Sequence, residues 1–274
     1  MPRLSGLFIY PVKSCRGHAL RESAVDAWGL AHDRRYLVVT PDGQFLTQRQ
    51  LPRMALIDTE ITAAGLALAS PNHGSVAIDL AAVAAARRSL SVTIWKNTVT
   101  ADDCGEPAAE WLTRFLGTPA RLVHMGPAYD RPLKPSKAQP GDVVSFADAY
   151  PFLMLSEASL ADLNDRLIAT GAEAVPLDRF RANLVVTDCA PFYEDTLTRF
   201  RLGELTFRQG GPCARCLVTT TDQERGERDG PEPLRTLATY RRDAEKPTDV
   251  NFGANIIHET KSGRLRVGDA LVPL

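Results

Sequence analysis

The chain has 274 residues, of which 44% are hydrophobic and 24% charged, and its formal net charge is -1. This is long enough for one large or two ordinary domains with a hydrophobic core, and the balanced charge does not favour nucleic-acid binding. The five cysteines are an odd number, which argues against a disulfide framework, so we expect a cytoplasmic protein. No signal peptide and no apolar run of the ~20 residues that span a bilayer is found, so no membrane association is expected.

The first hundred residues are rich in short apolar or alternating runs separated by turn sequences such as PDG and PNHG. This pattern is typical of antiparallel strands and predicts a β-barrel or sandwich. The expected strands cover residues 7–12, 34–40, 44–48, 56–62, 65–70, 75–80 and 91–96.

Three segments have helical patterns. Apolar residues recur on one face of residues 105–116, with Gly117 as a stop signal. A second helix is expected at 156–168, where Ser156 can serve as the N-cap, and a third at 231–242.

Residues 127–142 contain four prolines and no apolar period, which indicates a long loop or linker. We therefore expect two domains, 1–125 and 126–274, with an N-terminal β-barrel-like domain in the first and a second β-barrel with a few helices in the other. The predicted fold class is mixed α+β with strands dominant. Further strands are expected at 181–188, 205–211, 214–221 and 263–274.

The stretch GPCARCLVTTTD at 211–222 places Cys213 and Cys216 three positions apart. A structural zinc site needs four ligands, and no second cysteine or histidine pair follows. A thioredoxin-like redox pair would open a helix, whereas the Val and Thr residues after Cys216 indicate a strand. Two buried cysteines acting as small hydrophobic residues remain an alternative on this stretch alone.

Cationic and amide side chains occur at the ends of several expected strands, in the sequences YPVKSC, HDRRY and RFRANLVV. Arginine offers forked donors and lysine a point charge, and both suit a phosphate group. Together with Arg215 beside the two thiols, they indicate a metal held through an anionic organic ligand. The strand-end residues are Lys13, Ser14, Arg34, Arg35, Arg181 and Asn183.

Several longer motifs extend this pattern, namely TQRQLPR, ADDCGEPAAEWL, PFLMLSEASLADLN, CARCLVTTTD and RVGDALV. With YPVKSC and FRANLVV, they resemble the MOSC (molybdenum cofactor sulfurase C-terminal) domain and the β-barrel domain that precedes it. Within that group the chain is most similar to the mitochondrial amidoxime reducing components and their bacterial counterparts. The resemblance covers nearly the whole chain.

This resemblance implies a pterin molybdenum cofactor, with Cys216 as the one protein ligand of the metal. It assigns the pterin and its phosphate to Lys13, Ser14, Arg34, Arg181 and Asn183. It also implies that Ser156 and Arg215 lie near the same pocket. In the C-terminal sequence FGAN the chain departs from the family pattern, and we expect Asn255 to contact the substrate.

The implied activity is the reduction of small N-hydroxylated compounds, such as amidoximes and hydroxylamines, by two-electron removal of oxygen at a cysteine-ligated molybdenum. The alternative is a protein that carries or sulfurates the molybdenum cofactor without turnover of its own. No cysteine follows Cys216 and no Rossmann fingerprint is found, so electrons are expected from a separate flavin or iron-sulfur protein. Neither the family's membrane anchor nor the ferredoxin-like tail of some relatives is expected.

Overall fold

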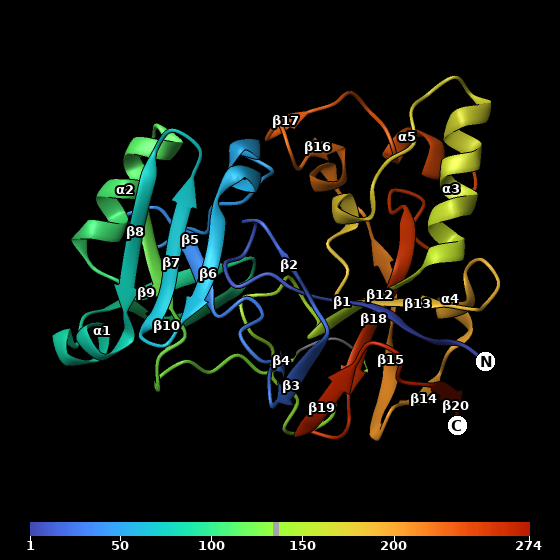
Figure 1. Ribbon diagram of the computed structural model, residues 1–274, viewed down its shortest axis with the longest axis horizontal. Helices are drawn as coiled ribbons and strands as arrows, with labels where there is room; N and C mark the ends of the chain where they lie inside the picture. The colour runs from blue at the N-terminus through green and yellow to red at the C-terminus, as the bar shows by residue number, and fades with distance from the viewer. Residues whose placement is uncertain (134–136) are drawn as a thin grey trace.

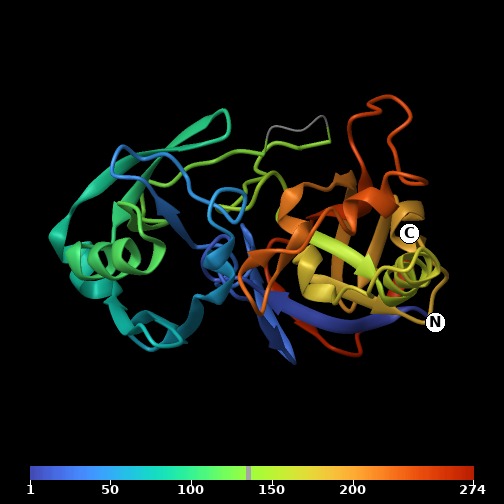
Figure 2. The same cartoon turned by 90° about the horizontal axis from the view of Figure 1, so that it is seen from above.

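The computed structural model describes residues 1–133 and 137–274 and shows two lobes side by side (Figure 1). Both ends of the chain lie on the same lobe, which contains most of the C-terminal half (Figures 1 and 2). Strands dominate both lobes and helices lie at their periphery, so the expected strand-dominated mixed fold is confirmed.

The first lobe contains a four-stranded sheet in the order β5-β11-β10-β9 and a three-stranded meander, β6-β7-β8. Its buried side chains form two clusters. One lies beneath helix α2, and the other is formed by side chains of the four-stranded sheet together with Tyr129 and Phe146. The strands are β5 (Tyr36–Val39), β6 (Asp58–Thr62), β7 (Gly65–Ser70), β8 (Gly74–Asp79), β9 (Ser89–Ile94), β10 (Asn97–Asp103) and β11 (Arg121–His124). The helices are the 3-10 turn η1 (Pro52–Leu56), α1 (Leu80–Ala86) and α2 (Glu106–Leu116).

Helix α2 closes the core of the first lobe, as its sequence predicts. Pro107 lies in its first turn, and Gly117 ends it in the left-handed conformation with φ 71°. Its apolar face buries Trp111 and Leu112 against the meander, where both side chains are almost inaccessible to water.

The second lobe is built on an eight-stranded sheet in the order β2-β1-β13-β12-β18-β15-β14-β20. Its strands are β1 (Arg3–Ile9), β2 (His18–Leu20), β12 (Phe152–Ser156), β13 (Leu184–Thr187), β14 (Arg199–Leu202), β15 (Leu205–Ala214), β18 (Asn251–His258) and β20 (Leu271–Pro273). A three-stranded sheet has the order β19 (Gly263–Arg266), β3 (Glu22–Asp26) and β4 (Gly29–Leu30), and β16 (Thr221–Asp222) pairs with β17 (Glu227–Arg228). The helices are α3 (Glu157–Ala169), η2 (Leu177–Phe180), α4 (Tyr193–Thr196), η3 (Leu217–Thr220) and α5 (Leu234–Leu237).

The N-terminal strands are part of the second lobe. Strand β1 runs antiparallel to β13, with Leu7 opposite Leu184, and β3 pairs with β19. The chain therefore begins in one lobe, builds the other, and returns, so it passes between the lobes before β5 and again between β11 and β12. The division of the sequence at residue 125 stays a prediction.

Three local expectations are corrected, and one helix was not predicted. Residues 217–220 form the 3-10 turn η3, not part of a strand, although Val and Thr favour strands, because tertiary context overrides this propensity. Residues 44–48 make only isolated bridges. The helix expected at 231–242 is restricted to α5 at its centre, where Pro231 and Pro233 restrict the start. Helix α1, capped by the side chain of Asp79, was not predicted.

The linker predicted at 127–142 contains no regular strand or helix over its described residues, and its residues 134–136 lie outside them. The longest described helix, α3, has 13 residues, and no helix in 1–133 or 137–274 combines the length and hydrophobicity required to cross a bilayer.

We expect Leu7→Ala to lower the free energy of unfolding by about 2–5 kcal/mol, because Leu7 is 1% exposed in the core of the second lobe. The control is Ile168→Ala on α3, where the residue is 61% exposed. This variant should change the free energy of unfolding by less than about 0.5 kcal/mol. Urea unfolding of both variants measures this. Equal losses would show that β1 is not an integral strand of the second lobe.

Candidate functional site: a cationic pocket between the lobes

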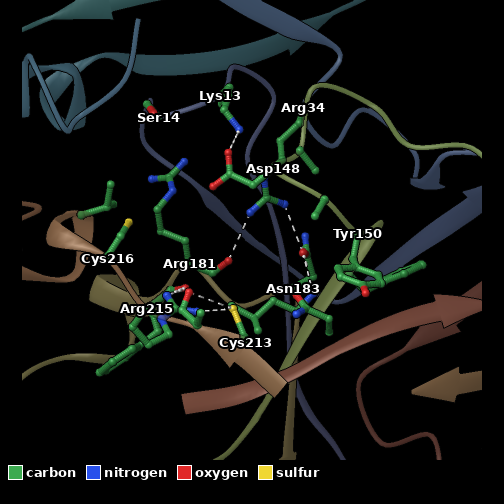
Figure 3. A pocket seen from close by; sticks show the side chains of 18 of the residues that line it. Lys13, Ser14, Arg34, Asp148, Tyr150, Arg181, Asn183, Cys213, Arg215 and Cys216 are labelled. Carbon is green, nitrogen blue, oxygen red and sulfur yellow. Dashed lines mark hydrogen bonds and ion pairs between the residues drawn. The ribbon is translucent and has the colours of Figure 1, made fainter. Parts of the chain in front are cut away.

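A pocket opens at the junction of the two lobes (Figure 3). Its cavity volume is about 140 Å³, which is below the ~300–1,000 Å³ that is usual for small-molecule sites. Seven separate segments of the chain contribute to it, and five of the lining side chains are cationic. The polar lining residues are Lys13, Ser14, Arg34, Arg49, Asp148, Tyr150, Arg181, Asn183, Cys213, Arg215, Cys216 and Asn255.

Lys13 follows β1 and is buried, with only 5% of its surface exposed. Its Nζ donates to Oδ1 of Asp148 at 2.5 Å. Burial lowers the pKa of Lys13 from 10.5 to about 8, although Asp148 partly opposes this. For Asp148, desolvation would raise the pKa, but the positive charges of Lys13 and Arg49 hold it far below its usual range. The pair is therefore ionised at neutral pH.

Arg34 and Arg181 both stack on the ring of Tyr10, with guanidinium carbons 4.7 and 4.2 Å from the ring centroid. Arg34 donates to Oδ2 of Asp33 at 2.5 Å and to the carbonyl of Arg181 at 3.2 Å. Burial lowers the pKa of Arg181, and its Nη2 has no hydrogen-bond partner in the described part of the chain. This nitrogen is a donor that a bound anion could satisfy.

Three of the pocket residues have an unusual backbone conformation. Ser14, Arg34 and Arg181 have φ values of 69°, 53° and 55°, in the left-handed region that residues with a Cβ seldom adopt. Each such residue costs of order 1–3 kcal/mol, and residues of this kind cluster at functional sites. Their concentration around one cavity supports a functional role for it.

Asn183 and Asn255 line the pocket, but both amides are engaged within the protein. Asn183 donates to the carbonyl of Phe8 at 3.1 Å, and its Oδ1 accepts from Arg34 at 3.1 Å. Asn255 donates to the carbonyl of Pro212 at 2.9 Å. Asn183 thus connects β1 and Arg34 at the start of β13, so it positions Arg34.

Ser156, which was expected near the pocket, is not among the residues that line it. It is fully buried, and its hydroxyl oxygen accepts from the backbone N–H of Ser159 at 3.0 Å as the N-cap of α3. The capping expectation is therefore confirmed, and the hydroxyl is engaged within the protein.

Cys213 and Cys216 both line the pocket, from the end of β15 and the start of η3. Arg215 donates from Nη1 to the sulfur of Cys213 at 3.0 Å and from Nη2 to the carbonyl of Phe180 at 2.8 Å. Cys216 instead lies beside Arg49: burial would lower the pKa of Arg49, but Asp148 and Cys216 raise it. The two thiols therefore have different cationic neighbours.

Three polar residues that line the pocket were not predicted from the sequence as site residues. Arg49 lies in TQRQLPR, one of the motifs that carry the family resemblance, so this motif could have indicated that Arg49 is a site residue. Asp148 and Tyr150 follow the linker, where no local pattern distinguishes them from surface residues. Among residues 1–133 and 137–274, no group of three or more His, Cys, Asp or Glu side chains could hold a metal ion.

The donors in the pocket fit an anionic organic group. The lining contains five cationic side chains and one carboxylate, and two buried guanidinium nitrogens of its arginines, Nη2 of Arg181 and Nε of Arg215, have no partner among the described residues. A phosphate accepts several such hydrogen bonds at once. A thiol at the same cavity is a ligand for a soft metal. Lys13, Ser14, Arg34 and Arg181, which line one cavity, could therefore hold a phosphate, and Cys216 could hold a metal.

Comparison with known proteins agrees with this architecture. The model of the MOSC N-terminal beta barrel domain matches residues 1–119, and that of the MOSC domain matches residues 141–272. Fold and site thus define a MOSC-domain protein with an N-terminal beta barrel domain.

The similar proteins include mitochondrial amidoxime-reducing component 1 of Homo sapiens, which is 35% identical over 96% of this chain and 80% of that protein. Component 1 of Danio rerio is 34% identical over 96% of this chain and 82% of its own length. Component 2 of Bos taurus is 34% identical, over 97% of this chain and 81% of that protein. The chain belongs to the family of the mitochondrial amidoxime-reducing components.

We expect the stability of the ligand-free protein to depend on pH through Lys13. Its pKa is about 8 in the folded chain and 10.5 in the absence of burial, so the folded state binds fewer protons between these values. Stability therefore rises with pH across this window. The full rise corresponds to about 3 kcal/mol, at roughly 1.4 kcal/mol per pKa unit.

Urea unfolding of the wild type and Lys13→Met at about pH 7.5 and about pH 10 measures this contribution. The free energy of unfolding of the wild type should increase relative to that of Lys13→Met as pH rises. A difference that is the same at both values would contradict the charged, buried state of Lys13.

Proposed function

We propose that the protein is a molybdenum-cofactor-dependent reductase of N-hydroxylated compounds. The observation that carries this proposal is the shared pocket, where Cys216 lies with Lys13, Arg34 and Arg181, residues far apart in the sequence. Membership of the amidoxime-reducing family supports the same activity. When bound, the cofactor would supply two-electron removal of oxygen from the substrate.

The chain's own residues would bind and orient that group. Lys13 and Ser14, which follow β1, and Arg181, which follows η2, would bind the cofactor's phosphate. Arg34 would support Arg181 by donating to its backbone carbonyl. Cys216 would ligate the metal. Arg49 would place a positive charge beside that sulfur.

The proposal includes a separate electron donor. A flavin or iron-sulfur protein would deliver electrons to the pocket. The five cysteines are all free in the structure, as the reducing environment of the cytoplasm would keep them.

Changing Cys216 to Ala should abolish turnover of benzamide oxime while the fold is retained, because the metal would lose its only protein thiolate. Cys213→Ala should keep most activity, since Cys213 would be a neighbour that bonds Arg215. Cys189→Ala, outside the pocket, is the control and should match the wild type. Equal loss in the Cys213 and Cys216 variants would indicate a two-thiol site and contradict the assignment.

The purified, molybdenum-loaded protein should reduce benzamide oxime with a chemical reductant such as reduced methyl viologen, and should be inactive with NADH alone. The physical reason is that a nicotinamide needs a hydride acceptor, for which the sequence has no flavin or Rossmann pattern. Product formation by chromatography measures both reactions. Turnover with NADH alone would refute the separate donor, and no turnover with any reductant would favour the alternative of a cofactor carrier.

A further inference from the structure

The hairpin between β9 and β10 presents an indole ring at the mouth of the pocket. Residues 95 and 96 form its two-residue loop, because Ile94 pairs with Asn97. Trp95 has φ 54°, at the first loop position, where glycine is the usual residue when φ is positive. The side chain is nevertheless 49% exposed, so burial of the indole does not account for its presence at this position.

Three contacts fix the orientation of the indole. Its ring packs edge-on against Phe45, with centroids 5.1 Å apart. The guanidinium of Arg49 lies 4.7 Å from the ring centroid, and Nε1 of the indole donates to Oδ1 of Asp148 at 3.2 Å. Arg49 and Asp148 both line the pocket, so the exposed part of the ring is held next to the opening.

The same arginine connects the indole to the thiol. Arg49 stacks on Trp95, forms an ion pair with Asp148 at 3.2 Å, and lies beside Cys216. A molecule that reached Cys216 from the side of Arg49 would therefore pass the exposed indole. Aromatic rings stack favourably on such a surface, whereas a small polar molecule gains little from it.

We propose that Trp95 is a specificity-determining residue that binds the aromatic ring of an N-hydroxylated aromatic substrate at the mouth of the pocket. This inference rests on the proposed function and adds the substrate class: flat aromatic compounds are preferred over N-hydroxylated compounds without a ring. Trp95 contributes to substrate binding and not to the reaction at the metal.

Steady-state kinetics with benzamide oxime and with hydroxylamine tests this preference. Trp95→Gly removes the ring and accommodates the positive φ, so the variant should fold. It should raise the KM for benzamide oxime about three- to tenfold and leave kcat, and the KM for hydroxylamine, unchanged. Trp95→Phe should stay within about twofold of the wild type, because the ring is kept although the bond to Asp148 is lost.

Lys96→Ala, on the same loop, is the matched control and should match the wild type for both substrates. Equal changes for the two substrates, or loss in Trp95→Phe as large as in Trp95→Gly, would overturn the proposal, because they would show that Trp95 acts only by holding Asp148. An unchanged KM for benzamide oxime in Trp95→Gly would overturn it as well.

Calorimetric titration of the loaded protein with benzamide oxime, without reductant, separates this inference from the proposed function. Tighter binding to the wild type than to Trp95→Gly, without turnover under any reductant, would support the indole site and refute the reductase. Turnover of benzamide oxime with equal affinity for both proteins would support the reductase and refute the indole site.

Discussion

The concentration of positive charge between the two lobes is the constraint on which the site depends. Lys13 and Arg181 are at most 9% exposed, and burial lowers the pKa of each. Asp148 and Asp33 neutralise part of this charge by pairing with Lys13 and Arg34. A buried cation without full compensation destabilises a folded protein, so an anionic ligand that completes the compensation stabilises it. Binding of an anionic ligand in the pocket should therefore stabilise the folded protein relative to the ligand-free state.

The fold maintains this arrangement through backbone contacts. Arg131, which is 3% exposed, donates to the carbonyls of Ala147 at 2.6 Å and Asp148 at 2.8 Å, and so fixes the loop that carries the Asp148 carboxylate. Tyr10, the ring between Arg34 and Arg181, packs on Gly17, where a Cβ would lie 2.3 Å from a ring carbon. Strand β1 delivers Lys13 to the junction because it is embedded in the sheet of the second lobe.

Features that depend on local sequence patterns could be predicted from the sequence. Helix α2 has an apolar face and a glycine stop, and the motifs around Lys13, Arg181 and Cys216 mark residues that the fold does bring to one pocket, although their roles as cofactor ligands stay predictions. What depends on tertiary contacts was missed: Asp148 is distinguished only by its partners, and strand β18, with its Gly and Asn residues, is a strand because β12 and β15 pair with it on both sides. For the same reason, η3 is a turn despite its Val and Thr residues.

The most direct measurement of the central claim is the pterin and molybdenum content of purified protein from a host that makes the cofactor, compared between the wild type and Arg181→Met. We expect about one pterin and one molybdenum per wild-type chain after gel filtration. Arg181→Met should lose both while its fold persists. Arg179→Met is the matched control, since this buried arginine bonds Asp229 outside the pocket, and it should retain both. Full retention by Arg181→Met, or a wild-type protein that never contains pterin, would contradict the account.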